Sequence, residues 1–521
     1  MVVSLVLILG LACQGAGDNP TKDDPGETGE TGESTGDSGD DSGSDSGESH
    51  SGDSGDDTDT DLAPQRCTGF ATSPTPFALP EVGATGAAFT GLRGDANCAS
   101  LDPAYTLADL LGDGRPELVV TRDCRDASVG RDVWSVYLGA SSGFGASPTA
   151  YALPTVSTTS AGLPFPTDEE PEDCEGSGLP GYALAELHGD GRAELVLTVD
   201  CVEEATGVSQ WLVYAAEPAG FAAAATPFTL PTAPIGEDPP WGRVEAGADC
   251  GDGVPGHALL DLSGDGAPDL VVTRACDDDT VGQARWDVYL GESGGVRATA
   301  TPWALPELGA DATFTGVEGA ASCRTGRGPT YVLAQVDGDG VLDLVVTEDC
   351  ADTTVGTSIW RVYTGSASGG FSATATDWAL PSYEDGAPVF LAPSARAACG
   401  QGDLPAYDAA DIDHDGWIDL IVSEDCQESE VGVTRWAVHR GGPGGFAQET
   451  TAWPLPSGYS VTDPPFVGRS GTADCASRDL PTWGLADLTQ DGALDLVVMY
   501  DCEDDAVGRS RWDVYAAICE G

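Results

Sequence analysis

The segment DIDHDGWIDLIVSEDC, residues 411–426, joins an acidic loop to an apolar strand and a cysteine, and variants of it recur along the chain. Each follows the pattern acid-x-x-x-Asp-Gly-x-x-acid, with an amide replacing the first acid once, and successive copies lie about 76 residues apart. A fixed period of this kind indicates a repeat protein, and we expect a β-propeller. The six copies begin at Asp109, Glu186, Asp261, Gln335, Asp411 and Asp487.

Four short strands are predicted in each repeat, as in one propeller blade. In the fourth copy they cover residues 331–336, 344–347, 360–363 and 376–381. The sixth copy stops after its third strand, whereas a fourth-strand segment, 70–80, precedes the first copy. We therefore expect the two ends of the chain to share one blade. The predicted fold is all-β, a six-bladed propeller of four-stranded antiparallel blades preceded by a disordered acidic linker.

The chain has 15 cysteines, and their spacing supports a closed ring. Cys13 lies in the N-terminal leader, and twelve others form couples that flank the first and second strands of each repeat. Cys67 and Cys519 flank the place where a hairpin would join the third and fourth strands of the shared blade. Buried free thiols are the alternative. We predict seven disulfides, Cys67–Cys519, Cys98–Cys124, Cys174–Cys201, Cys250–Cys276, Cys323–Cys350, Cys399–Cys426 and Cys475–Cys502.

The N-terminus resembles a bacterial lipoprotein signal. Residues 2–12 are an apolar run too short to span a bilayer, and the run ends at Cys13. Disulfides also require an oxidising compartment. We predict a signal peptide over 1–12, lipidation of Cys13, and a surface-exposed outer-membrane lipoprotein of the bacterial cell envelope. A secreted protein is the alternative.

Residues 13–62 are predicted to be a disordered tether, and residues 63–521 the propeller. Asp, Glu, Gly, Ser and Thr dominate the tether, so it cannot bury enough surface to offset its ordering entropy. The whole chain has a formal net charge of −64, which disfavours nucleic acid and anionic membrane surfaces as partners. We expect a protein or glycan ligand, membrane contact only through the lipid anchor, and a monomer.

The third to sixth acidic loops offer oxygen atoms at positions 1, 3, 5 and 9, and every copy has a glycine at position 6. Calcium takes about six to eight oxygen ligands, and a tight loop with this spacing can supply them. We predict Ca²⁺ as a structural cofactor held by the third to sixth loops. The predicted ligands are Asp261, Ser263, Asp265, Asp269, Gln335, Asp337, Asp339, Asp343, Asp411, Asp413, Asp415, Asp419, Asp487, Thr489, Asp491 and Asp495.

The first two loops are poorer candidates, because position 3 holds Leu111 in one and His188 in the other. The alternative for all six loops is a metal-free turn in which Asp side chains accept backbone amide hydrogen bonds. Converging carboxylates would repel one another without a counter-ion, so we expect calcium at least in the third, fifth and sixth loops. The weaker sites are Asp109, Asp113, Glu117, Glu186, Asp190 and Glu194.

The motif Asp-x-Asp-x-Asp-Gly-x-x-Asp-Leu, residues 411–420, resembles the FG-GAP or VCBS-type repeats of integrin α-subunit propellers and of many bacterial surface proteins. The resemblance covers about residues 63–521, and it implies a β-propeller with calcium in its loops. Two features depart from the family pattern. This sequence predicts fewer blades than an integrin propeller has, and it adds a cysteine couple to every repeat, so blade number and loop structure are not carried over.

A ligand is expected on the face opposite the acidic loops. Antiparallel strands place the loops after the second strands, and the long connections between repeats, on that face. These connections vary most, for example at residues 164–166 and 239–241, and long loops on a rigid scaffold often carry binding. Integrin-like propellers also bind ligand there, by resemblance. Recurring tryptophans are predicted to be core residues rather than a sugar-stacking ring: Trp134, Trp211, Trp286, Trp360, Trp436 and Trp512.

The predicted function is a cell-surface, calcium-stabilised binding module for an extracellular or envelope protein or glycan, without enzymatic activity and with no catalytic residues. The five histidines share no register, so they suggest no catalytic pair. One alternative is a polysaccharide hydrolase or lyase on a propeller scaffold, and another is a purely structural envelope protein. A carboxylate pair confined to one repeat would favour the enzyme, but the acids recur symmetrically.

Overall fold

The structure, a computed structural model, describes eleven stretches of the chain, the first beginning at Arg66. The predicted signal, the lipidation site Cys13, the tether and Cys323 lie outside them. The described residues form strands and turns, and no helix among them is long and apolar enough to cross a membrane. The stretches are 66–82, 86–156, 163–170, 174, 178–232, 239–308, 313–319, 328–382, 389–399, 404–459 and 464–520.

The first and second strands of each repeat pair as antiparallel neighbours on either side of an acidic loop. The first strands are β3 (Ala104–Ala108), β10 (Gly181–Ala185), β17 (Gly256–Leu260), β24 (Thr330–Ala334), β29 (Ala406–Ala410) and β34 (Thr482–Ala486). The second strands, each with at least five buried residues in succession, are β4 (Glu117–Arg122), β11 (Glu194–Val199), β18 (Asp269–Arg274), β25 (Asp343–Glu348), β30 (Asp419–Glu424) and β35 (Asp495–Tyr500).

The third and fourth strands complete each sheet toward its outer edge. The third strands are β5 (Val133–Tyr137), β12 (Gln210–Tyr214), β19 (Arg285–Tyr289), β26 (Ile359–Tyr363), β31 (Arg435–His439) and β36 (Arg511–Tyr515). The fourth strands are β8 (Thr149–Ala152), β15 (Thr226–Thr229), β22 (Thr301–Ala304), β27 (Thr376–Ala379), β32 (Thr451–Pro454) and, from the start of the chain, β2 (Thr75–Ala78).

Two kinds of short strand were not predicted. Two-residue strands add an inner neighbour to five of the first strands: β9 (Glu169–Glu170), β16 (Glu245–Ala246), β23 (Glu318–Gly319), β28 (Ser394–Ala395) and β33 (Ser470–Gly471). Small hairpins lie between third and fourth strands: β6 (Gly139–Ala140) with β7 (Gly143–Phe144), β13 (Ala216–Glu217) with β14 (Gly220–Phe221), and β20 (Gly291–Glu292) with β21 (Gly295–Val296).

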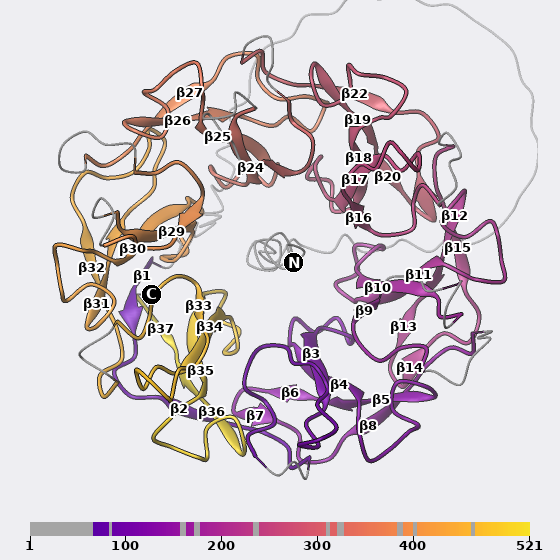
Figure 1. Ribbon diagram of the computed structural model, residues 1–521, viewed down its shortest axis with the longest axis horizontal. Coiled ribbons are helices and arrows are strands. Elements are labelled where there is room, and N and C mark those ends of the chain that lie inside the picture. The colour runs from indigo at the N-terminus through magenta and orange to yellow at the C-terminus, as the bar shows by residue number, and fades with distance from the viewer. Residues whose placement is uncertain are drawn as a thin grey trace, which may run out of the picture. The chain divides into compact units, whose positions relative to one another are not determined.

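The strands of the described residues form six sheets of five to seven strands and one two-stranded sheet, arranged in a propeller-like ring (Figure 1). The two ends of the described chain meet in the same sheet, because β2 pairs with β36 and places Phe77 opposite Trp512. This confirms the predicted sharing of one sheet by the two ends.

A disulfide closes the ring where a hairpin would otherwise continue the chain. The two-stranded sheet pairs β1 (Arg66–Phe70) with β37 (Ala517–Glu520), and Cys67 lies opposite Cys519. The Cys67–Cys519 bond joins residues 452 positions apart. Five other predicted disulfides are present, and Cys350 is disulfide-bonded while its predicted partner Cys323 is not described. The five are Cys98–Cys124, Cys174–Cys201, Cys250–Cys276, Cys399–Cys426 and Cys475–Cys502.

Neighbouring sheets interlock through the hairpins between third and fourth strands. The hairpin strand β14 pairs in parallel with β8 of the preceding repeat, with Gly220 opposite Ala152. Gly220 has a φ of 153°, and a Cβ atom there would lie 2.5 Å from the backbone nitrogen of Ala152. Gly295 repeats this arrangement against Thr229. Glycine is therefore required for the close approach of adjacent sheets.

The recurring tryptophans of the third strands are core residues, as predicted. Trp286 is 0% exposed, and its indole N–H donates to the carbonyl oxygen of Phe314 at 2.7 Å. The same bond recurs in the other five repeats. The acceptors include Phe165 and Trp241, which lie in the connections expected to contact ligand but are themselves buried. The aromatic residue that recurs in each connection therefore packs the core.

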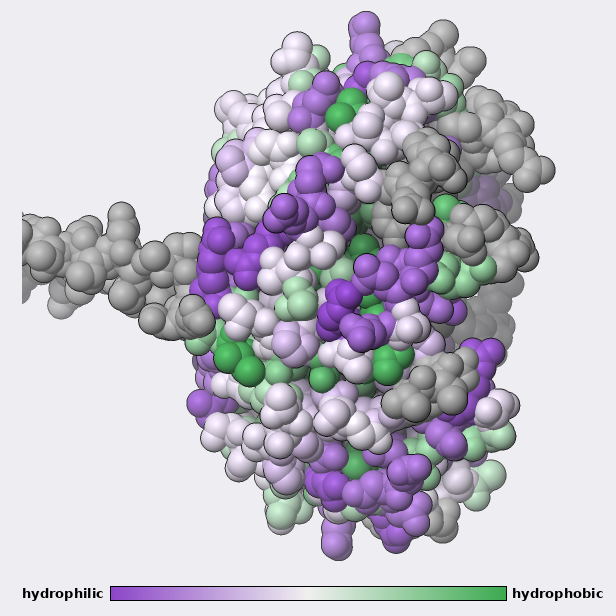
Figure 2. Space-filling model, turned by 90° about the vertical axis from the view of Figure 1, so that its left-hand side faces the viewer, coloured by the Kyte–Doolittle hydropathy of each residue, from purple (hydrophilic) through white to green (hydrophobic). Residues whose placement is uncertain are grey.

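The surface of the ring is mostly polar. Figure 2, which views its edge, shows hydrophilic residues spread among neutral ones with small hydrophobic spots. Among the described residues, only Leu138, Val202 and Ile518 are large hydrophobic residues classed as exposed. No broad apolar surface is therefore present on the described part of the chain.

Candidate metal centre

The acidic loops touch one another in a closed circle. We call segments 109–117, 186–194, 261–269, 335–343, 411–419 and 487–495 the first to sixth acidic loops. The residue at position 4 of each has a φ between 58° and 75°, and four of the six are glycine. Position 4 of one loop meets the next loop: Gly112 lies beside Arg192, Gly189 beside Gly266, Gly264 beside Gly340, Gly338 beside Gly416, His414 beside Gly492, and Gln490 beside Gly114.

Backbone amides orient the carboxylates of each loop, as the third loop illustrates. Asp261 accepts hydrogen bonds from the N–H groups of Gly264, Asp265 and Gly266. Asp269, at position 9, accepts through Oδ2 from the N–H groups of positions 2 and 3, at 3.1 and 2.9 Å. These bonds match the metal-free turn considered above. A carboxylate oxygen has more than one lone pair, so they also leave capacity for a cation.

The acid at position 9 also connects the loop to the segment after the third strand. Its Oδ1 atom accepts an N–H from the segment that follows the third strand in the third to sixth loops, and in the sixth this segment is β37. The four donor–acceptor pairs are Gly291–Asp269, Gly365–Asp343 and Gly441–Asp419, each at 2.8 Å, and Ala517–Asp495 at 3.2 Å. Each of these four loops is thereby fixed to the segment that follows the third strand of its own repeat.

The fifth loop brings together the carboxylates that the sequence singled out as the fullest set. Oxygen atoms of Asp411, Asp413 and Asp419 all lie within 4.8 Å of one another. Asp413 is 0% exposed, and among the described residues neither of its oxygens accepts a hydrogen bond. Its Oδ2 lies 3.1 Å from Arg440 Nη1. Asp415 Oδ2 also accepts no hydrogen bond and lies 2.8 Å from Arg66 Nη2.

Burial and neighbouring negative charges raise the pKa of two carboxyl groups in the fifth loop. Burial, reinforced by the Asp413 charge, raises the pKa of Asp419 to about 8. Burial and the Asp415 charge raise the pKa of Asp413 to about 6. Desolvation and like charges disfavour the ionised forms, and a divalent cation would reverse both effects.

The third, fourth and sixth loops share parts of this arrangement. In the third loop, the hydroxyl of Ser263 is buried and has no hydrogen-bond partner among the described residues, and burial raises the pKa of Asp269 to about 6. Burial raises the pKa of Asp343 in the fourth loop and of Asp495 in the sixth to about 7. Gln335, with its amide oxygen turned toward the loop, accepts from Asp339 N–H and so replaces the first acid.

The first and second loops differ from each other more than the sequence suggested. In the second, oxygens of Glu186, Asp190 and Glu194 lie within 4.8 Å of one another, and His188 Nδ1 is 3.1 Å from Glu194 Oε1. The imidazole therefore occupies one side of this cluster. In the first loop, Glu117 is buried, and burial raises its pKa to about 7.

The donor set of the fifth loop fits a hard divalent cation. It consists only of carboxylate oxygens, and the buried Asp413 oxygens have lone pairs available. Calcium prefers such oxygens, whereas zinc and copper sites are built largely from Cys and His. The disulfides leave no thiolate among the described cysteines, and His414 of the fifth loop is outside the carboxylate cluster.

A polar hollow lies on the opposite face, at the seam where β2 precedes the first repeat. Its volume is about 320 Å³. The position of Ser135 in this wall carries Leu212, Asp287, Arg361, Ala437 or Asp513 in the other repeats, so the lining at this position differs from repeat to repeat. Residue-by-residue variation of this kind could not be interpreted from the sequence alone. The lining residues are Glu81, Val82, Leu101, Pro103, Val120, Asp123, Arg125, Ser135 and Tyr137.

No protein-family model matches the sequence. No curated protein matches it either. Among solved structures, the chain is similar to the Photorhabdus luminescens Tc holotoxin pore, with 16% identity over 87% of this chain and 15% of the toxin chain, and a TM-score of 0.42. It is also similar to an Agrocybe aegerita lectin, described as recognising non-reducing terminal N-acetylglucosamine, with 14% identity over 80% of this chain and 79% of the lectin, and a TM-score of 0.37.

Proposed function

We propose that the protein is a six-bladed, calcium-stabilised propeller of the FG-GAP or VCBS type that binds a protein or glycan at the bacterial cell envelope. In this proposal each of the six larger sheets is one blade, and the acidic loops form a ring at one end of the axis. The closed circle of contacts from Gly112 through to Gln490 supports six repeats around one axis.

The observation that carries the calcium proposal is the buried Asp413 carboxylate. It lies beside two other carboxylates, and neither of its oxygens accepts a hydrogen bond among the described residues. An ionised group in such a place is costly unless cations compensate it, and the Arg440 guanidinium, 3.1 Å from Asp413 Oδ2, supplies a single positive charge beside several carboxylates. Asp411, Asp413, Asp415 and Asp419 would hold the ion. When bound, calcium would offset two of the four negative charges of the loop.

The binding role is proposed for the opposite face, with the polar hollow as its first candidate subsite. The hollow exposes groups of several kinds, including the Ser135 hydroxyl, the Arg125 guanidinium and the Asp123 carboxylate. Such a mixture suits a polyhydroxylated ligand or a polar peptide segment. Its lining combines residues that follow β2 with residues of the first repeat, so the hollow lies between two neighbouring segments of the ring.

Anchoring would leave this face accessible. Arg66, the first described residue, lies next to Asp415 of the fifth loop, so the chain enters the ring on the acidic-loop face. If Cys13 is lipidated, the tether would lead from the membrane to that face, and the opposite face would point away. Outer-membrane attachment and monomeric state are parts of the same proposal.

The test is capture of envelope proteins and a glycan panel by the immobilised protein, in calcium and in EDTA. Saturable, calcium-dependent binding supports the module. Ser135→Leu should fill the hollow and weaken binding about tenfold or more, and Arg125→Gln should weaken it less. Arg297→Gln is a matched control, because Arg297 is exposed and pairs only with Glu292 on another blade.

Three outcomes contradict the proposal. New reducing ends or unsaturated sugars would indicate the enzyme alternative. Calcium-dependent self-association without a ligand would indicate a structural envelope protein. Binding that is unchanged in Ser135→Leu would remove the hollow as the subsite, although a calcium-dependent module would remain.

A further inference from the structure

The fifth acidic loop differs from the others in the cations beside it. Arg440 Nη1 lies 3.1 Å from Asp413 Oδ2, and Arg66 Nη2 lies 2.8 Å from Asp415 Oδ2. Among the ion pairs of the described residues, no other arginine contacts a carboxylate of an acidic loop. Both carboxylates are buried, with side-chain exposures of 0% and 2%.

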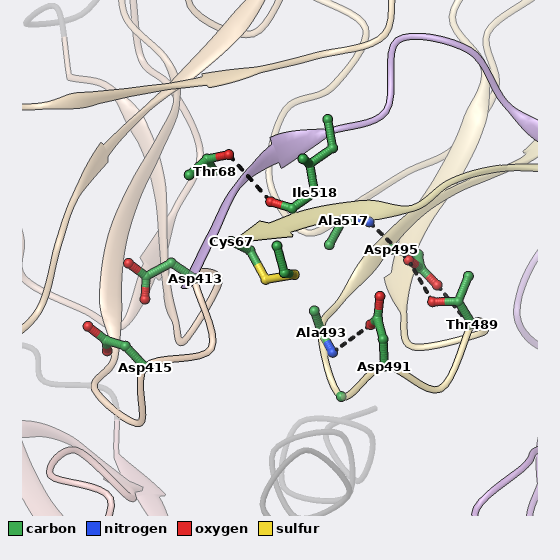
Figure 3. The surroundings of a disulfide bond; sticks show 12 residues. Cys67, Thr68, Asp413, Asp415, Thr489, Asp491, Ala493, Asp495, Ala517 and Ile518 are labelled. Carbon is green, nitrogen blue, oxygen red and sulfur yellow. Dashed lines mark hydrogen bonds between the residues drawn. A yellow bond between two sulfur atoms is a disulfide. The ribbon is translucent and has the colours of Figure 1, made fainter. Parts of the chain in front are cut away.

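The fold holds both arginines in place. Arg440 lies between β31 and Gly441, whose N–H donates to Asp419. Arg66 begins β1, and the next residue, Cys67, donates its N–H to the carbonyl oxygen of Asp413 at 2.9 Å. Figure 3 shows Cys67 alongside Asp413 and Asp415, with β1 leading away from them.

The rest of β1 is anchored as well. The Cys67–Cys519 disulfide ties it to β37, and the Phe70 ring packs edge-on against Trp436 and Trp453, with centroids 5.6 and 5.8 Å apart. Because both ends of this short strand are fixed, the guanidinium of Arg66 is kept close to the fifth loop.

The corresponding positions of the other repeats carry no cation. Arg440 follows Trp436 by four residues, and that position holds Leu138, Ala215, Leu290, Thr364 and Ala516 elsewhere. Arg66 precedes the hairpin glycine Gly69 by three residues, and that position holds Ala140, Glu217, Glu292, Ala367 and Gly442 elsewhere. The two arginines are therefore a property of one loop and not of the repeat.

The charges of the two arginines reverse the order of cation affinity that the number of carboxylates in each acidic loop would suggest. The fifth loop has four carboxylates, and two guanidinium groups reduce its formal charge to −2. The third and sixth loops have three carboxylates each and keep a formal charge of −3. A cation entering the fifth loop also has to separate Arg66 and Arg440 from the oxygens that would coordinate it.

We propose that Arg66 and Arg440 are internal counter-ions that compete with a metal cation for the fifth acidic loop. This inference rests on the proposed calcium role of the loops. The fifth loop then binds cations more weakly than the third and sixth, and it keeps its shape when calcium is scarce because the arginines already compensate Asp413 and Asp415.

A terbium titration can observe the fifth loop selectively. Trp417 is the residue at position 7 of this loop, and the other loops have Arg115, Arg192, Ala267, Val341 and Ala493 there. Indole-sensitised terbium emission requires close approach, so Trp417→Phe should remove the signal of the fifth loop. The terbium emission of the wild-type protein minus that of Trp417→Phe reports terbium bound at the fifth loop. Added calcium should reduce this difference, because calcium displaces terbium.

Arg66→Gln should lower the terbium concentration for half-saturation about fivefold, because it removes one competing charge next to Asp415. Arg66 is 56% exposed, so this variant is expected to fold. Arg440→Gln should lower the terbium concentration for half-saturation about tenfold. The same variant should be less stable than wild type in EDTA, because Asp413 loses its ion-pair partner. Arg285→Gln, which removes an arginine paired with Asp278 and Asp287 away from the acidic loops, should change nothing.

The outcomes separate the two proposals. Absence of Trp417-dependent emission would refute cation binding by the fifth loop, and with it part of the proposed function. Trp417-dependent emission with the same half-saturation in Arg66→Gln, Arg440→Gln and wild type would leave the calcium role intact and overturn the competition. Weaker binding in Arg66→Gln would also overturn it, because the arginine would then support the site.

Discussion

The backbone N–H of Cys67 donates to the carbonyl oxygen of Asp413 at 2.9 Å, so the residue that closes the ring is also in contact with the fifth acidic loop. Two residues before the partner Cys519, the N–H of Ala517 donates to Asp495 of the sixth loop at 3.2 Å. The disulfide therefore joins two strands that each hold an acidic loop (Figure 3).

Loss of the clasp disulfide should cost more stability than loss of a disulfide within one repeat. Chain-entropy estimates give about 6 kcal/mol for a loop of 452 residues and about 3.5 kcal/mol for one of 26. We expect the double variant Cys67→Ser/Cys519→Ser to unfold at lower denaturant than Cys250→Ser/Cys276→Ser. Equal midpoints in urea would show that the clasp has no special role.

Calcium removal should lower the melting temperature of the full chain by about 5 °C or more. A site saturated about a thousandfold above its dissociation constant stabilises the folded state by about 4 kcal/mol. Scanning calorimetry in calcium and in EDTA measures the shift, and magnesium serves as the control because it prefers a smaller, octahedral site. A melting curve indifferent to EDTA would remove the calcium proposal.

The pH dependence of stability should differ between calcium and EDTA. In EDTA the folded state binds protons more tightly than the unfolded chain, because burial raises the pKa of Asp419 to about 8 and of Asp495 to about 7. The stability that the protonated forms of Asp419 and Asp495 contribute to the folded state is present at low pH and is lost as the pH rises through these pKa values.

The melting temperature in EDTA should therefore fall between pH 6 and pH 8.5. Calcium requires the ionised carboxylates, so its stabilising effect should grow over the same range. Parallel curves in the two buffers would mean that these carboxylates do not bind the ion.

Gly220→Ala should destabilise the protein by about 2 to 4 kcal/mol. Its φ of 153° disfavours any side chain, and the added methyl would lie 2.5 Å from the Ala152 backbone nitrogen. Gly247→Ala is the matched control, since a Cβ atom at this position would have no neighbour within 4 Å. A comparable loss in both variants by urea denaturation would refute the interlocking role of the hairpin.

Much of the scaffold follows from periodic features of the sequence. The repeat spacing, the strand order, the union of both chain ends and the Cys67–Cys519 pairing were all predicted, because each repeats or completes a pattern. The buried third-strand tryptophans were predicted for the same reason. The short inner strands such as β9 (Glu169–Glu170) were not, because two-residue pairing leaves no periodic signal.

The features that break the pattern were missed. Arg66 is far from the fifth loop in sequence, and Arg440 follows the third strand of the fifth repeat. Only the fold brings Arg66 to Asp415 and Arg440 to Asp413. The burial of Phe165 and Trp241 was also missed, since their connections differ in sequence although the aromatic position is shared. These contacts depend on packing between residues that are far apart in the sequence, and the repeat pattern does not predict such packing.

The calcium proposal is tested most simply by the number of calcium ions bound per chain. Elemental analysis by mass spectrometry after equilibrium dialysis measures it on the wild type and on Asp413→Asn. We predict three or more calcium ions per wild-type chain, from the third, fifth and sixth loops at least, and about one fewer in the variant. A wild-type chain that retains no calcium would contradict the proposal.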